Sequence, residues 1–320
     1  MEKEFPNSEI LLIYEAKNCN PNGDPDVENK PRIDPKTNIN YVSDVRLKRF
    51  FRDYVVEKFG EDTIYVTKIA GDSVRADTRV EKLLGSIDEK TVHRILGKCI
   101  DARLFGATIP IGKGEAEKGA AKSFIGPVQF TWGFSLHKVE LMDSSAITSV
   151  FSGREAAERY GTMGRDWRVY YSLIGFYGIV SGRRARGTGM TENDLKVFDN
   201  LVWLALCNQP TTRSKIGEKP HLYIRVQYVN ADAILGDLRK FIKVKPKREP
   251  IRDLEDLDLN VDGLVEHIRN NIDAISKVYL RTSEELGFIQ SPIKNCCQER
   301  FSTLPHQMTA EEEKAIIMRT

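Results

Sequence analysis

The strongest hydrophobic signal in the chain is the run of residues 10–14 (ILLIY), which is apolar at every position. A short continuous apolar run of this kind is typical of a buried strand. The segment that follows, residues 20–26 (NPNGDPD), is rich in Asn, Pro and Gly, which break strands and favour turns. The pattern therefore predicts a buried strand that ends in a polar turn.

A helix is predicted to start at Ser43, because serine is a favoured N-cap residue. Its apolar side chains recur at the spacing of one helical face, and its cations occupy the remaining faces. The apolar set is Leu47, Phe50, Phe51 and Tyr54, and the basic set is Arg46, Lys48, Arg49 and Arg52. The cations could form an ordinary solvated face, or they could lie beside the polar turn and contact an anionic ligand.

The later pattern predicts two core strands, one within residues 126–141 and one over 172–180, because both are β-rich in composition. A capping pattern at Thr191–Asp194 introduces a second amphipathic helix. Residues 221–230 then alternate between apolar and polar positions, as in a half-buried strand. The resulting β-α-β-β-α-β order indicates an α+β fold with a ferredoxin-like or RRM-like core.

Two segments interrupt this order and are interpreted as insertions. The first, residues 61–122, contains a Gly/Lys/Glu-rich stretch at 112–119 that is expected to be flexible. The second, residues 144–171, has β-prone ends around a glycine-punctuated tip, which predicts a projecting ribbon. After residue 230 one further helix is predicted, over residues 264–280, from apolar positions in helical register.

The distribution of charge along the chain is more informative than the overall charge. The formal net charge of +2 and a pI of about 8.1 do not by themselves indicate a nucleic-acid binder. Arginine is concentrated in residues 151–190, however, whereas residues 251–262 are acidic. A local basic surface is therefore expected rather than a basic protein.

Neither a metal site nor a cofactor is expected. The five cysteines include no C-x-x-C pair, and the five histidines show no ligand spacing. The N-terminus has no hydrophobic signal region, and no apolar run reaches the ~18 residues of a membrane helix. These features favour a cytoplasmic protein that is not inserted into a membrane.

Three separated motifs resemble one known family. They are Asn-Pro-Asn-Gly-Asp-Pro at 20–25, Ser-Asp-Val-Arg-Leu-Lys-Arg at 43–49 and Thr-Thr-Arg-Ser-Lys at 211–215. In this order they are similar to the backbone subunit of type I CRISPR surveillance complexes (Cascade), in the Cas-seven family and nearest its I-B and I-C branches. The resemblance extends over about residues 9–230.

The resemblance implies an RRM-like palm over residues 1–230, with fingers at 61–122 and a thumb at 144–171. Residues 231–320 would form a partly helical extension packed on this core. The implied function is to bind CRISPR RNA (crRNA) and polymerise along it, without catalysis. The implied partners are crRNA, the target DNA strand paired to the guide, further copies of the chain, and Cas-five-type, large and Cas-six-type subunits of Cascade.

The candidate RNA-binding residues come from four parts of the chain. Small polar residues let an RNA backbone approach closely, and cations neutralise its phosphates. The polar turn and the following helix supply Asn20, Asn22, Gly23, Ser43, Arg46, Lys48 and Arg49. The loop predicted at residues 181–189 supplies Arg183, Arg184 and Arg186 beside a helix N-terminus, and the last motif supplies Thr212, Arg213, Ser214 and Lys215.

The predicted ribbon supplies Met163, Arg165 and Trp167. In the family, the thumb inserts an apolar side chain that displaces a base of the guide. Met163, between two glycines at the expected tip, is the first candidate for this wedge, and Trp167 is the alternative.

Two other interpretations remain open. Asp24, Asp26 and Glu28 could belong to a metal-dependent ribonuclease like the backbone subunits of type III complexes, although Asp24 also suits a turn that it closes by hydrogen-bonding its own backbone. Residues 175–180 (GFYGIV) weakly resemble an RNP1 motif, which would stack bases on the sheet.

Overall fold

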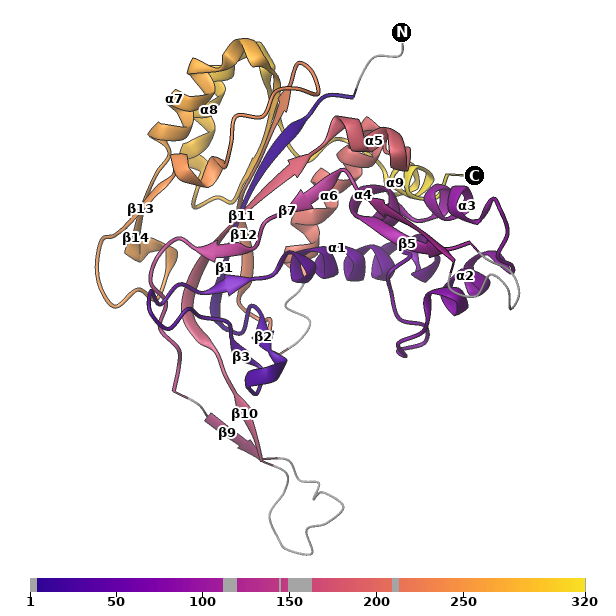
Figure 1. Ribbon diagram of the computed structural model, residues 1–320. Helices are drawn as coiled ribbons and strands as arrows, with labels where there is room; N and C mark the ends of the chain where they lie inside the picture. Colours follow the sequence, from indigo (N-terminus) through magenta and orange to yellow (C-terminus); the bar gives the residue numbers. More distant parts are fainter. Residues whose placement is uncertain (1–4, 112–119, 144, 149–162, 209–212, 320) are drawn as a thin grey trace, which may run out of the picture.

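The computed structural model describes residues 5–111, 120–143, 145–148, 163–208 and 213–319. Within them, one mixed eight-stranded sheet runs through the middle of the molecule (Figure 1). Its strands are β1 (Ser8–Cys19), β4 (Tyr41–Val42), β7 (Val128–Phe130), β8 (Gly133–Ser135), β11 (Val169–Val180), β12 (Glu218–Tyr228), β15 (Ile275–Thr282) and β16 (Phe301–Thr303). They are ordered β16-β15-β12-β1-β11-β8-β4, and β7 also pairs with β11.

The central strand β1 confirms the predicted buried strand at residues 10–14. Its side chains alternate between two hydrophobic clusters, with Leu12 in one and Leu11 in the other, and both are fully buried. The strand predicted at 172–180 is β11, and the region 126–141 contributes two short strands, β7 and β8. β12 is buried on both faces, so the prediction of a half-buried strand there is wrong, because helices cover each side of the sheet.

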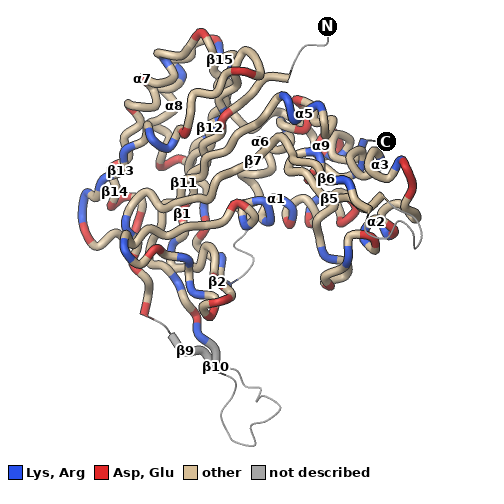
Figure 2. Tube along the Cα trace, viewed as in Figure 1, with Lys and Arg blue, Asp and Glu red and all other residues tan. Residues whose placement is uncertain are grey.

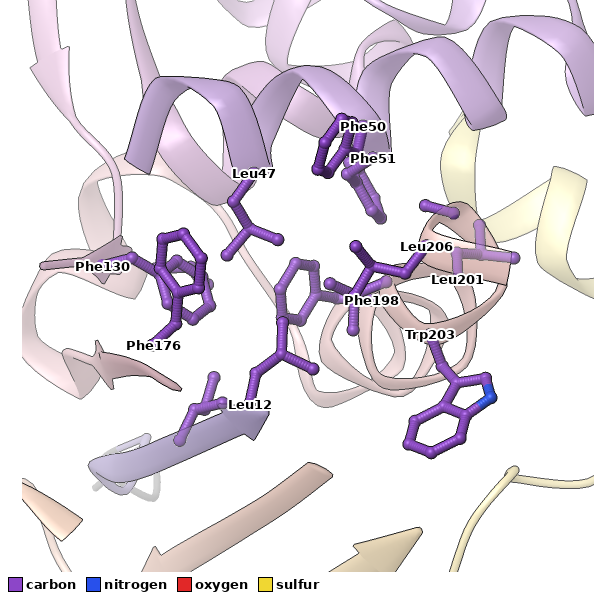
Figure 3. Packing of buried hydrophobic residues seen from close by; sticks show 14 of the residues in the cluster. Leu12, Leu47, Phe50, Phe51, Phe130, Phe176, Phe198, Leu201, Trp203 and Leu206 are labelled. Atoms are coloured by element: carbon purple, nitrogen blue, oxygen red, sulfur yellow. The ribbon is translucent and has the colours of Figure 1, made fainter. Parts of the chain in front are cut away.

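Helices α1 (Asp44–Phe59) and α6 (Glu192–Asn208) cover the first face. Figure 3 shows aromatic side chains from both helices meeting above the sheet. The ring centroids of Phe51 and Phe198 lie 5.3 Å apart, and fully burying one such side chain is worth about 1.5–3 kcal/mol. Helix α9 (Ala310–Ile317) adds to this layer, since the Lys58 ammonium of α1 pairs with the Glu313 carboxylate of α9 at 2.8 Å.

Helices α7 (Asp262–Asn270) and α8 (Gln290–Cys297) cover the second face, beside a small ribbon of β13 (Lys243–Pro246) and β14 (Leu257–Asn260). The single helix predicted over 264–280 is therefore wrong in its second half. Helix α7 ends at Asn270, and β15 begins at Ile275 and pairs with β12. Alternate residues of β15, Val278 and Leu280, are buried in the second hydrophobic cluster.

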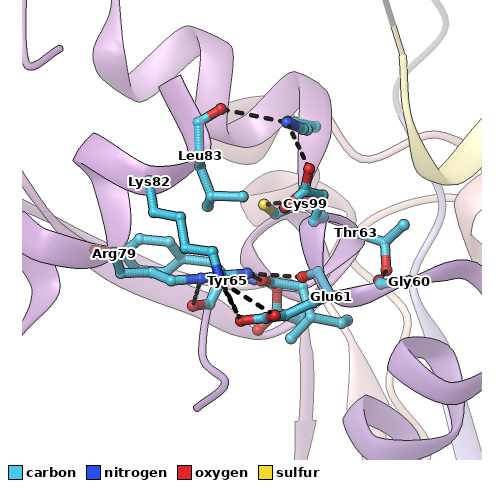
Figure 4. Close-up of polar contacts among 12 residues, drawn as sticks. Gly60, Glu61, Thr63, Tyr65, Arg79, Lys82, Leu83 and Cys99 are labelled. Carbon is cyan, nitrogen blue, oxygen red and sulfur yellow. Dashed lines mark hydrogen bonds and ion pairs between the residues drawn. The ribbon is translucent and has the colours of Figure 1, made fainter. Parts of the chain in front are cut away.

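The predicted first insertion has a hydrophobic cluster of its own. It contains α2 (Ala76–Leu84), α3 (Thr91–Lys98), α4 (Ile100–Phe105), β5 (Gly106–Pro110) and β6 (Ala121–Ile125). The buried Arg79 guanidinium donates hydrogen bonds to the carbonyl oxygens of Glu61 (2.7 Å) and Ile64 (2.6 Å), and so ties α2 to the chain that leaves α1 (Figure 4). The stretch 112–119, which was expected to be flexible, lies outside the described residues.

The predicted ribbon is also present. Strands β9 (Ser145–Thr148) and β10 (Met163–Asp166) pair antiparallel and project from the sheet (Figure 1). Met163 is the first residue of β10, and its backbone lies opposite Thr148. Residues 149–162, between the two strands, lie outside the described residues. No helix in the described part of the chain is both long enough and apolar enough to span a bilayer.

Candidate nucleic-acid interface

A groove of about 420 Å³ lies where β1 ends. Four separate segments form it: the turn after β1, the first turn of α1, the base of the β10 ribbon and the turn before β12. Eight of the predicted RNA-binding residues line it together with Asn29 and Asp166, namely Asn20, Asn22, Gly23, Arg46, Arg165, Trp167, Ser214 and Lys215. Figure 2 shows basic residues in this region, between β2 and the base of β10.

The polar turn after β1 is held from both sides of the groove. The Asn20 backbone N–H donates to the Ser214 carbonyl at 3.0 Å, and the Asn20 side-chain amide donates to the Asn29 carbonyl at 2.6 Å. Asn22 Oδ1 accepts from both the N–H (2.9 Å) and the hydroxyl (3.1 Å) of Ser43. Ser43 does occupy the N-cap of α1 as predicted, but its hydroxyl bonds to Asn22 instead of to the helix.

Gly23 lies in a two-strand ribbon of β2 (Gly23–Asp24) and β3 (Lys30–Pro31). A Cβ at this position would lie 2.6 Å from the carbonyl oxygen of Asn29, which is closer than real Cβ contacts. The turn therefore requires glycine at this position.

Of the predicted cations of α1, Arg46 is the one that lines the groove. Its guanidinium lies over the Phe50 ring, 4.4 Å from the centroid. Lys48 is buried, where it contacts Asp44 (3.0 Å) and Gln129 (2.9 Å), so it does not lie on an exposed cationic face. Arg49 pairs with Asp53 on the same helix at 2.5 Å.

The base of the ribbon forms the opposite wall. Arg165 pairs with Glu28 at 3.1 Å, and the Lys30 ammonium lies 4.9 Å from the centroid of the Trp167 ring. Within the described residues, the indole N–H of Trp167 has no hydrogen-bond acceptor. Arg213 approaches Asp166 at 3.4 Å and so adds a further cation near the groove. Thr212 lies outside the described residues.

Lys215 is almost fully buried at the floor of the groove. Its ammonium donates to the carbonyl oxygens of Asn20 and Pro21 (2.8 Å to Pro21), and it lies 3.8 Å from Oε1 of Glu218. Burial lowers the pKa of Lys215 to about 8 and raises the pKa of Glu218 to about 7, against the opposing effect of each charge on the other. Sequence reasoning missed Glu218, although an acid three residues after the lysine, at the start of an apolar strand, was a signal for it.

The acids near the polar turn are engaged in turns and ion pairs. Asp24 accepts a hydrogen bond from the Asp26 N–H at 3.2 Å and pairs with Arg32 at 3.1 Å. This geometry confirms that Asp24 closes a turn. Among the residues that the structure describes, no three His, Cys, Asp or Glu side chains are placed to hold a metal ion.

The segment 181–189, predicted to be a phosphate-binding loop, is mostly a short helix, α5 (Gly182–Thr188). Its first N–H, that of Gly182, donates to Asn7 Oδ1 at 2.9 Å. The N–H of Thr191, the residue before helix α6, donates to Asp194 Oδ2 at 2.7 Å. The prediction of a loop is therefore wrong, and side chains of the chain itself accept hydrogen bonds from these two N–H groups. Phosphate binding by the segment stays a prediction.

The arginines of α5 are also far from the groove. They follow the end of β11 opposite to the groove, and β11 is 12 residues long, or roughly 36 Å at ~3.3 Å per residue. Arg183 pairs with Asp232, Arg184 is exposed, and Arg186 lines a different cavity beside α3.

The RNP1-like segment is not available for base stacking. Phe176 is fully buried, and the hydroxyl of Tyr177 donates to the Glu9 carboxylate within the second hydrophobic layer. Because both faces of the central strands β1, β11 and β12 are covered, the interpretation that residues 175–180 stack bases is wrong.

Comparisons with known proteins agree with one another. The family model described as "CRISPR-associated protein Cas7" matches residues 6–262. A curated protein of Haloferax volcanii, "CRISPR-associated protein Cas7", is 33% identical over 293 residues, which is 85% of this chain and 86% of that protein. Two solved structures have a similar fold over 97% of this chain: "CRISPR RNA-guided surveillance complex" (98% of that chain, TM-score 0.50, 15% identity) and "CRISPR RNA-guided surveillance complex, pre-nicking" (99% of that chain, TM-score 0.53, 14% identity).

Proposed function

Because the chain belongs to the CRISPR-associated protein Cas7 family, we propose that it is a structural subunit that binds the guide RNA of a CRISPR surveillance complex of the Cascade type. The observation that carries this proposal is the groove. It is formed by four segments that are far apart in the sequence, and eight of the residues predicted from the sequence to contact RNA line it. The names of the two solved structures with this fold support an RNA-guided complex.

The chemistry of the groove suits a nucleic-acid backbone better than a base edge. Arg46, Arg165 and Lys215 supply positive charge, and Asp166 is the acid among the lining residues. Asn20, Asn22 and Ser214 add small polar groups that suit sugar and phosphate oxygens, which carry no sequence information. Trp167 adds an aromatic ring on which a base of any identity can stack.

The arrangement of the sheet supports an RRM-like core. Strands β12, β1, β11 and β7/β8 are neighbours in that order and pair antiparallel, and α1 and α6 connect them in the β-α-β-β-α-β sequence. This order of elements and strands supports a ferredoxin-like arrangement of the core. The chain adds β15 and β16 beside β12, beyond the four-stranded core.

We further propose that copies of the chain follow one another along the guide, with other Cascade subunits at the ends and target DNA paired to the guide. Base pairing then supplies specificity while each copy recognises shape and charge. Met163 remains a prediction as the wedge that displaces a guide base. The α5 arginines remain predicted contacts on a separate surface.

The type III ribonuclease alternative has less support. A metal-assisted ribonuclease needs convergent carboxylates that hold a divalent ion and orient a water. Here Asp24 pairs with Arg32, and Glu28 pairs with Arg165. We therefore propose that bound RNA stays intact when Mg²⁺ or Mn²⁺ is added, and regularly spaced cuts that depend on Asp24 would favour the enzyme instead.

The proposal is tested by RNA affinity as a function of salt. The wild-type protein should bind single-stranded RNA with an affinity that falls steeply as salt rises, because phosphate contacts release counterions. Arg46→Gln should lower the affinity about tenfold, as the loss of one charge-assisted contact predicts. Arg75→Gln makes the same charge change at an exposed residue outside the groove and should leave the affinity nearly unchanged. Equal losses in both variants would contradict the groove.

A further inference from the structure

Beneath the groove lies a buried ion pair that the proposed function does not by itself require. Lys215 is 7% exposed and Glu218 is 3% exposed. A tight turn joins them, in which the Glu218 N–H donates to the Lys215 carbonyl at 3.1 Å. Gly217 has a φ of 113°, and a Cβ there would lie 1.9 Å from the carbonyl oxygen of Lys17 on β1. The backbone of the pair is therefore fixed against the central strand.

The lysine of this pair holds a wall of the groove. Its ammonium donates to the carbonyl oxygens of Asn20 and Pro21, which belong to the polar turn that lines the groove. Glu218 approaches the ammonium at 3.8 Å, and within the described residues neither of its carboxylate oxygens accepts a hydrogen bond. A buried carboxylate without hydrogen bonds is costly, and the positive charges of Lys215 and Arg46 are the groups that favour its ionised form.

We propose that Glu218 is a positioning residue of the groove: its carboxylate keeps the Lys215 ammonium charged, so that the ammonium fixes the Asn20–Pro21 turn and presents a cation to the RNA phosphodiester backbone. This inference rests on the proposed function. It identifies Glu218 as the residue that controls the charge of Lys215 in the RNA-binding groove. Glu218 acts through Lys215 and does not itself contact RNA.

Cys19, Tyr14 and Arg46, which lie around the pair, do not change their charge near neutral pH. Lys215 and Glu218 are therefore the groups of this cluster that titrate there. From β1, burial raises the pKa of Cys19 to about 12 and the pKa of Tyr14 well above its usual value, so both stay neutral. From α1, Arg46 stays charged, because a guanidinium does not deprotonate in proteins. From the base of the ribbon, Arg165 and Asp166 line the same groove.

The sign of the effect follows from the charges. Burial lowers the pKa of Lys215, and the negative charge of Glu218 raises it in part. Removing that negative charge lowers the lysine pKa further, so the ammonium loses its proton at a lower pH. Because an anionic RNA favours the protonated lysine, RNA affinity should then fall at a lower pH as well.

The test measures the affinity of the full chain for a short single-stranded RNA from pH 6 to pH 9. Glu218→Gln should bind like the wild type at pH 6, where the lysine is protonated in both proteins. Its affinity should begin to fall about 1 pH unit earlier than that of the wild type, by up to about tenfold per unit. The matched control is Glu285→Gln, which makes the same charge change at a half-exposed acid paired with Lys219 and should follow the wild type.

Three outcomes for Glu218→Gln would overturn the inference. An unchanged profile would show that Glu218 does not act on Lys215. Tighter binding at every pH would show that Glu218 merely repels RNA, and equally weaker binding at every pH would show a role in folding alone. If the wild type binds no RNA at any pH, the proposed function fails together with this inference.

A second variant keeps the inference testable if Glu218→Gln does not fold. Lys215→Met removes the titrating ammonium, so its RNA affinity should be lower than that of the wild type at pH 6, where the lysine of the wild type is protonated. At pH 8, adding Glu218→Gln to Lys215→Met should not lower the affinity further, because Glu218 supports RNA binding only through the Lys215 ammonium. A Lys215→Met protein that binds RNA as tightly as the wild type at pH 6, or a further loss of affinity in the double variant at pH 8, would overturn the inference.

Discussion

Asn22 connects two walls of the groove through one side-chain oxygen. This oxygen accepts hydrogen bonds from the N–H and the hydroxyl of Ser43, and so joins the polar turn to the start of α1. An acceptor that satisfies two donors in a partly buried place cannot be removed without leaving both donors unpaired. Asn22 thus has a structural role beside its predicted contact with RNA.

Two substitutions separate these roles. Asn22→Ala should lower the free energy of unfolding by about 1–3 kcal/mol, because it leaves the N–H and the hydroxyl of Ser43 without an acceptor. Asn22→Asp keeps the acceptor and should change stability much less, but it places a negative charge in the groove and should weaken RNA binding more. Thermal unfolding measures the stability of both variants, and RNA titration measures their affinity. Equal RNA affinity in the two variants would refute the prediction that a negative charge at residue 22 weakens RNA binding.

At this scale, the sequence predicts the residue types of the groove but not their partners. Lys215 was chosen as a cation in a polar motif, yet its ammonium is buried against two carbonyl oxygens. Lys48 was assigned to an exposed face, but its side chain is buried and donates a hydrogen bond to Gln129 of β7. Such pairings join residues far apart in the chain, so local patterns contain no information about them.

At the scale of elements, strongly periodic segments were predicted correctly and ambiguous ones were not. The helix after Ser43 and the helix after Thr191 each have an N-cap residue and apolar side chains at the spacing of one helical face. Residues 264–280 satisfy helical spacing, yet β15 forms there because the edge of β12 offers a ladder of backbone partners. Tertiary pairing of this kind overrides a local periodicity.

Helix α5 yields a prediction that compares two basic elements. Arg183→Gln combined with Arg184→Gln should lower RNA affinity less than Arg46→Gln combined with Lys215→Met, although both pairs remove two positive charges. The reason is exposure: Arg183 is largely exposed and already paired with an equally exposed Asp232, so solvent and salt screen it. Binding curves at two salt concentrations measure this, and a larger loss from the α5 pair would move the main contact surface to α5.

At the scale of the whole molecule, the covered sheet decides where RNA can bind. Helices α1 and α6 bury one face of the central strands β1, β11 and β12, and α7 and α8 bury the other, so these described strands offer no open surface for bases. The groove instead lies at the end of β1, between the body of the protein and the projecting ribbon. The order of the elements and the two amphipathic helices predicted the sheet and the cover of its first face. The cover of its second face depends on residues beyond 230, where the sequence pattern predicted one helix and did not indicate that it packs on the sheet.

The most direct test of this account is to irradiate the RNA-bound protein with ultraviolet light and to identify the cross-linked peptides by mass spectrometry. The account predicts cross-links in the segments that form the groove, at residues 20–23, 165–167 and 213–215, with Trp167 as the aromatic ring available for stacking. The same RNA should leave the peptides of α7 and α8 unmodified. Cross-links that avoid the groove and fall on α5 or on the second face of the sheet would contradict it.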